Sequence, residues 1–295
     1  MIKVFILSSP RSGSTLLRLT LDKINGLTTL PETHFWVFKK ANNNLNPSTE
    51  ADRTMLADRW VSFYTIKKYP GNHEELKARI IHEARSWKDM LDFTVTWLLT
   101  LKAGKITDGN MVAEKSPPHI FYQDEIKKMY PDAKFIYIVR DPRDVVASLK
   151  TCNWSTSNVL INSRVWRNSI RKMRKGTDTL LVKYEELVTQ PQAQLERICV
   201  FLGTTFNPEA ISKSTSDDVE SGSRSSKNAL KPMNTGFIES FREKLSYVDK
   251  EREIIEHVCR KEMDMLGYKT YSFKKNWTFR KAYFVTRVGL FLSRI

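Results

Sequence analysis

The sequence predicts an α/β fold: a P-loop-like central parallel sheet flanked by helices, with a helical insertion and a C-terminal amphipathic helix. Buried-strand patterns alternate with helical patterns along the chain, which is typical of a parallel sheet covered by helices on both faces. The first strand is joined to the first helix by a polar turn that contains glycine. In addition, 41% of the 295 residues are hydrophobic, so the chain can bury a sizeable core.

Short apolar segments define the predicted strands. Residues 3–7 and 134–139 are rich in β-branched and aromatic side chains, and residues 179–183 have the same character. Residues 111–114 form a shorter segment of this kind. Helical periodicity predicts the intervening helices at residues 14–26, 122–129, 143–149, 162–172 and 192–202.

Residues 52–102 depart from this alternation. They are helical in pattern and rich in aromatic and charged side chains. We interpret them as an insertion that packs over the carboxyl edge of the sheet, where α/β folds bind ligands. The same aromatic side chains also suit an ordinary helical core. Residues 1–272, including this insertion, are expected to form one domain.

The remaining residues, 273–295, are expected to form a basic amphipathic tail. Over residues 274–295, apolar side chains fall on one face of a predicted helix, and Arg280, Arg287 and Arg294 line its flank. Such a helix suits an anionic membrane surface. A terminal helix that packs against its own domain is the alternative interpretation.

The charge balance is the unusual bulk property of this chain. Lys and Arg total 48 against 33 Asp and Glu, which leaves a net charge of +15. This excess indicates a polyanionic ligand, such as a nucleic acid, an acidic glycan or an anionic membrane. The basic residues are scattered along the chain, and no motif that reads DNA or RNA is visible. We therefore expect no nucleic-acid partner.

The cysteines and the apolar segments indicate the cellular compartment in which the protein is expected. Cys152, Cys199 and Cys259 are odd in number and far apart, which predicts neither a disulfide framework nor a zinc site. No segment offers the roughly 20 uncharged apolar residues of a membrane span. The apolar run at residues 1–7 is too short for a signal peptide. We expect a cytoplasmic protein, peripheral on the inner face of the membrane if its tail binds there.

The loop between the first strand and the first helix resembles a phosphate-binding P-loop. Gly13 and Thr15 stand where the P-loop has its second glycine and its hydroxyl, whereas Ser14 replaces the lysine that reaches the β- and γ-phosphates. Backbone N–H groups, an arginine and several hydroxyls remain to bind an anion. A P-loop kinase or another nucleotide-binding protein is the alternative. The loop assigned to this anion consists of Pro10, Arg11, Ser12, Gly13, Ser14 and Thr15.

A second motif follows the predicted strand at residues 134–139. The chain turns into a helix just after Arg140, which therefore lies at the carboxyl edge of the sheet, where ligands bind. Ser148 is eight residues further on. Together, Arg140 and Ser148 are candidates for clamping a second phosphate. A purely structural ion pair between Arg140 and Asp144 is the alternative.

Taken together, these motifs resemble those of the PAPS-dependent sulfotransferases, in particular the carbohydrate and tyrosylprotein branches. Residues 10–15 resemble the family's loop for the 5′-phosphosulfate, and residues 139–148 resemble its 3′-phosphate motif. Residues 114–117, 130–136 and 182–188 also match, in the family's order and spacing. The resemblance implies transfer of the sulfuryl group of 3′-phosphoadenosine-5′-phosphosulfate (PAPS) to a hydroxyl, with adenosine 3′,5′-diphosphate (PAP) as product and no metal.

The resemblance also implies which residues bind PAPS. Those from Arg11 to Thr15 would hold the 5′-phosphosulfate, and Arg140 and Ser148 would hold the 3′-phosphate. Tyr184 would lie near the adenine. The stretch 225–234 is similar to the last cofactor loop of the tyrosylprotein branch, in which Ser225 and Lys231 would close over the nucleotide.

The catalytic residues are likewise implied by the resemblance. Glu32 matches the glutamate that the carbohydrate and tyrosylprotein branches use as general base, and His34 is the alternative base. A carboxylate that is partly desolvated beside phosphates should have a raised pKa, closer to that of a useful base. Lys115 and Arg11 would stabilise the charge that develops on the leaving diphosphate.

The sequence leaves the acceptor and the oligomeric state open. A glycan, a glycolipid or other lipid, a small hydroxylated metabolite and a peptide tyrosine all fit the chemistry. The positive net charge favours an anionic glycan or a lipid-borne acceptor.

Overall fold

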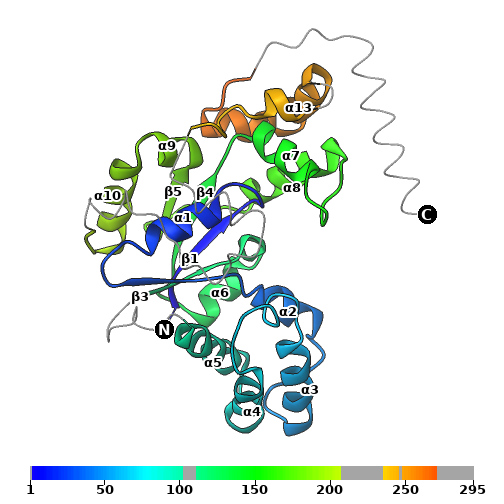
Figure 1. Cartoon of the computed structure of the whole chain (residues 1–295), viewed down its shortest axis with the longest axis vertical. Helices are drawn as coiled ribbons and strands as arrows, with labels where there is room; N and C mark the ends of the chain where they lie inside the picture. The colour runs from blue at the N-terminus through cyan, green and yellow to red at the C-terminus, as the bar shows by residue number, and fades with distance from the viewer. Residues whose placement is uncertain (1, 102–110, 207–234, 246–247, 271–295) are drawn as a thin grey trace, which may run out of the picture.

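The computed structural model describes residues 2–101, 111–206, 235–245 and 248–270. Within these residues, five parallel strands form a sheet in the order β2-β3-β1-β4-β5 (Figure 1). The strands are β1 (Ile2–Ser8), β2 (Leu27–Leu30), β3 (Met111–Lys115), β4 (Lys134–Val139) and β5 (Thr179–Lys183). This sheet and the helices around it confirm the predicted α/β class.

Strand β2 was not among the predicted strands. Its sequence, Leu-Thr-Thr-Leu, is short and half polar, and it directly follows the stretch that was assigned to the first helix. That helix, α1 (Ser14–Leu21), ends earlier than the periodicity predicted. Asp22 then accepts hydrogen bonds from the Thr29 backbone N–H (2.8 Å) and hydroxyl (2.7 Å). This contact holds the threonines of β2 in place at the edge of the sheet.

The two faces of the sheet are covered by different helices. Val4 and Ile6 of β1 point to a core shared with α1, whereas Phe5 and Leu7 point to a core on the opposite face. Both cores are apolar, as expected for a parallel sheet that is buried on both sides. The remaining helices are α2 (Phe35–Ala41), α3 (Glu50–Val61), α4 (His73–Glu83), α5 (Trp87–Thr100), η1 (Pro117–Phe121), α6 (Gln123–Met129), α7 (Pro142–Lys150), α8 (Val159–Arg171), α9 (Tyr184–Thr189), α10 (Pro191–Leu202), α12 (Phe241–Lys244) and α13 (Val248–Leu266).

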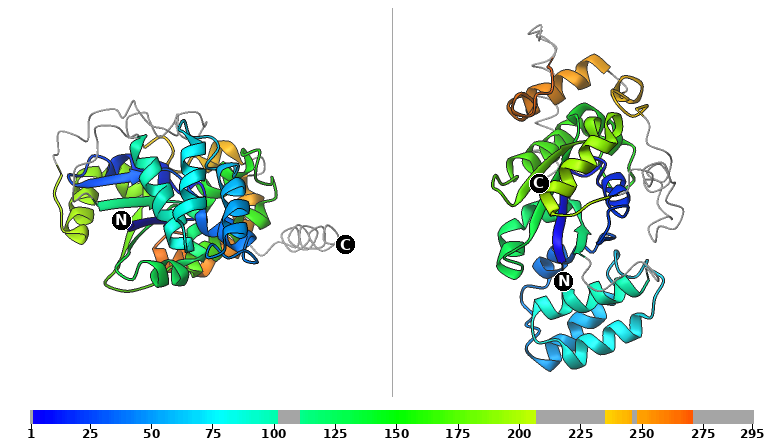
Figure 2. Two further views of the ribbon diagram at one scale, coloured as in Figure 1. Left: turned by 90° about the horizontal axis from the view of Figure 1, so that it is seen from below. Right: turned by 90° about the vertical axis from the view of Figure 1, so that its left-hand side faces the viewer.

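The segment interpreted as an insertion contributes α3, α4 and α5. Figures 1 and 2 show these helices gathered at one end of the molecule. Trp60 and Trp97 are buried in the core that also contains Phe5, so most of the aromatic side chains in this segment serve packing. Tyr64 is the exception, because 53% of its surface is exposed. It lies in the turn at residues 62–69 that follows α3.

A third core lies at the other end of the molecule. Helices α7, α8 and α13 pack together there around Trp166, Ile255 and Met263 (Figure 1). The sequence interpretation did not identify α13, although it is long and amphipathic. Among the described helices, none has the length and apolar character needed to span a bilayer. The predicted tail, 273–295, lies outside the described residues.

Candidate active site

The loop expected to hold the 5′-phosphosulfate is shaped by two residues in the left-handed region. Arg11 has φ 66° and Gly13 has φ 94°. A Cβ atom added at Gly13 would lie 2.5 Å from Cδ2 of Tyr184. Glycine is therefore required at position 13 by both backbone conformation and the close approach of an aromatic ring.

This loop contains buried polar groups that fit an anion. The hydroxyls of Ser9 and Ser12 are buried and have no hydrogen-bond partner among the described residues. Leaving such a group unsatisfied costs about 1–3 kcal/mol, so a ligand that accepts their hydrogen bonds would be favoured. Helix α1 begins at Ser14, directly after the loop, and no described side chain caps its N-terminus. Backbone N–H groups in such a turn bind phosphate and sulfate.

Arg11 connects this loop to the second predicted phosphate motif. Its Nε donates a hydrogen bond to Oγ of Ser148 on α7, at 3.0 Å. The structure thus brings the first loop and the end of the second motif into direct contact, although they are 137 residues apart.

Arg140 lies at the carboxyl end of β4, as the motif predicted. Its guanidinium group lies over the ring of Tyr184, 4.4 Å from the ring centroid. It donates to the backbone carbonyl of Phe237 and lies 3.6 Å from Oδ2 of Asp144. The ion pair named as the structural alternative is therefore present. However, Nε of Arg140 is buried without a partner in the part of the chain that is described, and so remains a donor for a ligand.

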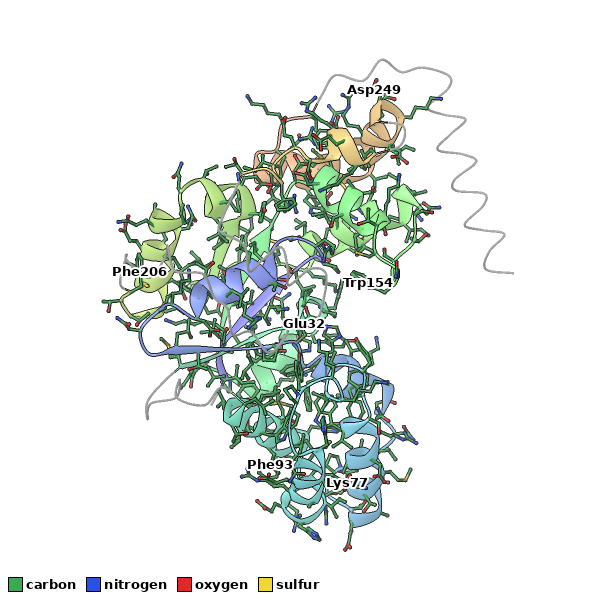
Figure 3. All side chains as sticks on the ribbon, viewed as in Figure 1. Glu32, Lys77, Phe93, Trp154, Phe206 and Asp249 are labelled. Atoms are coloured by element: carbon green, nitrogen blue, oxygen red, sulfur yellow. The ribbon has the colours of Figure 1, made fainter. Side chains whose placement is uncertain are left out.

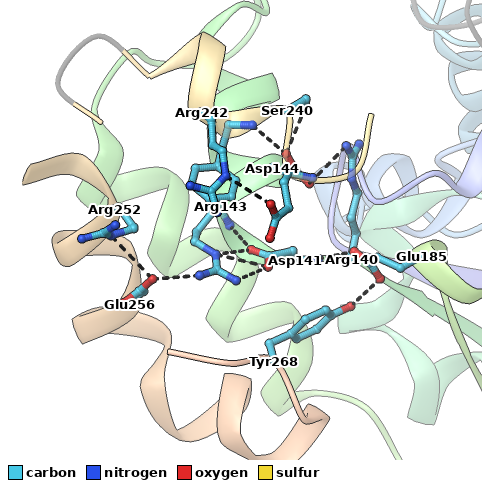
Figure 4. A network of polar contacts seen from close by, with 12 residues as sticks. Arg140, Asp141, Arg143, Asp144, Glu185, Ser240, Arg242, Arg252, Glu256 and Tyr268 are labelled. Atoms are coloured by element: carbon cyan, nitrogen blue, oxygen red, sulfur yellow. Dashed lines mark hydrogen bonds and ion pairs between the residues drawn. The ribbon is translucent and has the colours of Figure 1, made fainter. Parts of the chain in front are cut away.

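A buried polar network fixes the turn that carries Arg140 (Figure 4). Arg143 forms ion pairs with Asp141 and with Glu256 on α13. Glu185 accepts hydrogen bonds from the Asp141 backbone N–H (2.9 Å) and from the Tyr268 hydroxyl (3.0 Å). Burial raises the pKa of Glu185. These contacts come from three different elements, and they leave the turn little freedom to move.

Asp144 on α7 binds the segment that begins at residue 235. Its carboxylate accepts hydrogen bonds from the backbone N–H groups of Glu239 (2.9 Å) and Phe241 (2.8 Å) and from the Ser240 hydroxyl (3.0 Å). Ser240 Oγ in turn accepts a hydrogen bond from Lys244 at 2.8 Å. Burial raises the pKa of Asp144.

Lys244 is a cation that the sequence interpretation missed. Burial, together with the nearby positive charges of Arg140 and Arg11, lowers its pKa. The charges of Arg11 and Arg140 therefore act on Lys244, and an anion bound beside these three cations would relieve their mutual repulsion. No motif in the sequence pointed to Lys244, because only the contacts with Asp144 bring its helix to this place.

Two of the predicted catalytic residues, Glu32 and Lys115, belong to a chain of contacts at the carboxyl ends of β2 and β3. Nζ of Lys115, which is fully buried, lies 2.6 Å from Oε1 of Glu32 and 3.4 Å from Oγ1 of Thr15. Oε2 of Glu32 lies 3.1 Å from Nε2 of His34. Nδ1 of His34 forms a hydrogen bond with the hydroxyl of Tyr64. Figure 3 shows Glu32 near the middle of the molecule, where the helical segment meets the sheet.

The raised pKa that was expected for Glu32 is wrong for this arrangement. Burial alone would raise the pKa of its carboxyl group. However, the ammonium of Lys115 and the imidazole of His34 outweigh burial and hold the pKa of Glu32 well below its usual range. The nearby positive charge of Lys115, which the expectation did not include, decides the direction.

A buried hydrogen-bond cluster supports the backbone on which Glu32 lies. The backbone N–H groups of Thr33 and His34 both donate to Oγ of Ser116, at 3.1 Å. Glu114 accepts hydrogen bonds from the Thr33 hydroxyl (2.8 Å) and from Ser116, and Nδ1 of His119 lies 3.0 Å from its other oxygen. His119 is fully buried in this supporting cluster. The sequence interpretation had recognised residues 114–117 as a motif but had assigned no role to Glu114 or Ser116.

Tyr184 is buried and separates Gly13 from Arg140, while Pro10 and Ser14 flank the loop at its two ends. Ser225 and Lys231 lie outside the described residues. Within residues 2–101, 111–206, 235–245 and 248–270, no group of three or more His, Cys, Asp and Glu side chains is arranged to hold a metal ion.

Comparisons with known proteins identify the family and the fold. Residues 3–208 match the family described as "Sulfotransferase family". The chain is 24% identical over 249 residues to the protein-tyrosine sulfotransferase of Drosophila melanogaster; the match covers 78% of this chain but only 45% of the fly protein.

Two solved structures are similar in fold. The sulfotransferase domain of the Synechococcus PCC 7002 olefin synthase has a TM-score of 0.66 at 21% identity, with 92% of this chain and 96% of that chain covered. The sulfotransferase domain from the curacin biosynthetic pathway has a TM-score of 0.57 at 20% identity, with coverages of 92% and 99%.

Proposed function

This chain belongs to the sulfotransferase family, and from that premise we propose that it transfers the sulfuryl group of PAPS to a hydroxyl of an acceptor. The observation that carries the proposal is the contact between Arg11 and Ser148, which joins the two phosphate motifs at 3.0 Å. One nucleotide with phosphates at both its 3′ and 5′ positions would suit two anion sites that lie side by side.

The proposal assigns the binding of PAPS to the residues of the two phosphate motifs. The loop from Arg11 to Thr15 would bind the 5′-phosphosulfate through its backbone N–H groups and hydroxyls. Arg140 and Ser148 would bind the 3′-phosphate, with Lys244 nearby. The unpaired buried donors at Ser12 and Arg140 support this assignment, since PAPS supplies acceptor oxygens for both. Ser225 and Lys231 belong to the proposal as residues that would close over the nucleotide.

Glu32 and Lys115 would carry the chemistry together. The acceptor oxygen attacks the sulfur while its proton passes to Glu32, and the bond between sulfur and the bridging oxygen of PAPS breaks. Once Glu32 is neutral, it no longer holds the ammonium of Lys115. That ammonium can then stabilise the negative charge that develops on the departing phosphate, as can Arg11.

The low pKa of Glu32 is compatible with this role. In the described structure the carboxylate is stabilised mainly by Lys115, which lies 2.6 Å away. A bound phosphosulfate beside Thr15 would compete for the same ammonium, because Lys115 also contacts Thr15. Losing part of that interaction would raise the pKa of Glu32 and make it a stronger base when the donor is present.

For the acceptor we propose a hydroxylated molecule that carries negative charge, either an anionic glycan or a lipid-borne compound. A cavity of about 510 Å³ lies between α2 and η1, which directly follow His34 and Ser116 in the chain. Its walls include two lysines, two aromatic rings and one carboxylate, so the lining is net positive and suits an anionic group attached to a ring. Its lining residues are Val37, Lys39, Lys40, Asn43, Pro118, Phe121, Tyr122 and Glu125.

The proposal is tested by incubating the protein with PAPS labelled in its sulfuryl group and with an extract separated into lipid, polysaccharide, protein and small-molecule fractions. Label is expected in one fraction, and only when the protein is present. A parallel thermal-shift panel should show stabilisation by PAP and none by MgATP. Stabilisation by MgATP alone would instead support a P-loop kinase or another nucleotide-binding protein.

A further inference from the structure

The turn that follows α3 binds the segment that carries Glu32 at three successive residues. The hydroxyl of Tyr64 is hydrogen-bonded to Nδ1 of His34. The hydroxyl of Thr65 donates to the carbonyl of Thr33 at 2.6 Å. The hydroxyl of Tyr69 donates to the carbonyl of Glu32 at 3.0 Å. The helical segment therefore contacts the proposed base directly, in addition to packing against the sheet.

His34 needs this support because its backbone is strained. Its φ of 53° lies in the left-handed region, which costs a residue other than glycine about 1–2 kcal/mol. Ser116 holds the His34 backbone N–H from one side, at 3.1 Å. Tyr64 holds the imidazole from the other side, and the two rings lie 5.5 Å apart at an angle of 70°. The side chain of His34 is only 13% exposed, so its ring has little room to turn.

The directions of the hydrogen bonds follow from the chemistry of each group. Nε2 of His34 lies 3.1 Å from Oε2 of Glu32 but has no hydrogen-bond partner of good geometry among the described residues, so this contact alone does not place the ring proton. The hydroxyl of Tyr64 donates to a nitrogen that carries a lone pair, so in a neutral imidazole Nδ1 accepts its hydrogen bond and Nε2 carries the proton, facing a carboxylate that can only accept. Burial and the negative charge of Glu32 both raise the pKa of Tyr64, so this phenol keeps its proton and remains a donor.

We propose that Tyr64 is a positioning residue, which holds His34 as the neutral tautomer with its proton on Nε2 and so orients the carboxylate of Glu32 for proton transfer. Through the contact between Tyr64 and His34, the helical segment would influence the orientation of the Glu32 carboxylate. This inference rests on the proposed function for its catalytic part, whereas the tautomer of His34 can be observed without any turnover.

The first test is nuclear magnetic resonance of protein labelled with ¹⁵N-histidine, with the signals of His34 assigned from the variant His34→Gln. In the wild type, Nε2 should be protonated and Nδ1 should not. In Tyr64→Phe, the Nδ1 signal should move towards that of a protonated nitrogen, because the phenol that donates to Nδ1 is lost and the tautomer with its proton on Nδ1 becomes populated. Tyr64→Phe keeps the ring that packs on Phe63, so the fold should be retained.

The second test is the transfer rate at saturating PAPS, measured in the extract fraction that accepts label. Tyr64→Phe should lower this rate about tenfold, a part of the 10²–10⁴-fold that a positioned base contributes. The dissociation constant for PAP and the melting temperature should not change. Thr54→Ala is the control, since it also removes a hydroxyl from the helical segment, but Thr54 is exposed on α3 and donates to the carbonyl of Glu50 within its own helix, at 3.1 Å. It should match the wild type in both tests.

Two outcomes would overturn the inference. One is a His34 spectrum in Tyr64→Phe that is identical to the wild type, with an unchanged transfer rate. The other is a fall in transfer rate that is matched by equal losses of PAP affinity and melting temperature, which would make Tyr64 a general structural residue. Failure of the wild type to bind PAP or to transfer label would contradict the proposed function instead and would leave the tautomer test intact.

Discussion

The ammonium of Lys115 lies 2.6 Å from a carboxylate oxygen of Glu32, although the two residues are 83 positions apart in the chain. Each of them changes the chemistry of the other. Lys115 is fully buried and needs a nearby negative charge, and Glu32 is held ionised by the positive charge beside it. The proposed reaction depends on breaking this pair at the moment when the acceptor gives up its proton.

Replacing Glu32 with glutamine should remove the base and leave nucleotide binding intact. We expect the transfer rate of Glu32→Gln to fall at least ~100-fold, the lower end of the contribution of a positioned base. Its dissociation constant for PAP, measured by calorimetry, should remain close to the wild-type value. Near-normal transfer in this variant would remove Glu32 from the role of base.

Replacing Arg140 with alanine should weaken the binding of PAP by an order of magnitude or more, since a charge-assisted hydrogen bond is lost. The affinity for adenosine 5′-monophosphate, which lacks the 3′-phosphate, should change little. Arg174→Ala is a matched control, because the side chain of Arg174 forms an ion pair with Asp124 at the surface. Equal weakening for both nucleotides would contradict the assignment of Arg140 to the 3′-phosphate.

Gly13→Ala should destabilise the folded protein and impair PAP binding. The new methyl group would meet the ring of Tyr184 at 2.5 Å, in addition to the cost of φ 94°. Gly203→Ala separates these effects, because Gly203 also has positive φ, at 75°, but a Cβ there meets nothing within 4 Å. In urea unfolding, Gly203→Ala should lose about 1–2 kcal/mol and Gly13→Ala clearly more. Equal losses in the two variants would show that the contact with Tyr184 costs nothing.

The pairing of Glu32 with Lys115 should make stability depend on pH. Burial alone would raise the pKa of Glu32, but Lys115 and His34 hold it below the ordinary value of 4.5. The pair therefore stabilises the folded state fully above pH 4.5, and this contribution is lost progressively as the pH falls below 4.5. The difference in unfolding free energy between wild type and Glu32→Gln should be larger at pH 7 than at pH 3.5. An equal difference at both values would contradict the lowered pKa.

The basic tail is proposed to bind anionic membranes, which would place the protein on the inner face of the membrane. Vesicles that contain anionic lipid should sediment the full-length protein, and more weakly as salt is increased. The variant truncated to residues 1–273 should remain in solution. If both proteins sediment to the same extent, the tail is not the membrane-binding element.

Local patterns in the sequence determined the central strands of this α/β fold and the motifs at their ends. Strands β4 and β5 begin and end at the predicted residues, because an apolar, β-branched run between polar turns has few other buried conformations. The positions of Arg11 and Arg140 at strand ends followed from the same local patterns. Parallel strands place their carboxyl ends at one edge, so motifs that follow different strands meet there.

Contacts between distant segments were decided only by the tertiary structure. Strand β2 depends on pairing with β3, and its two threonines gave too weak an apolar pattern to predict it. The pKa of Glu32 depends on Lys115, and the orientation of His34 depends on Tyr64. Electrostatic and hydrogen-bond interactions act over a few ångströms, and separation along the chain does not reveal which side chains come that close.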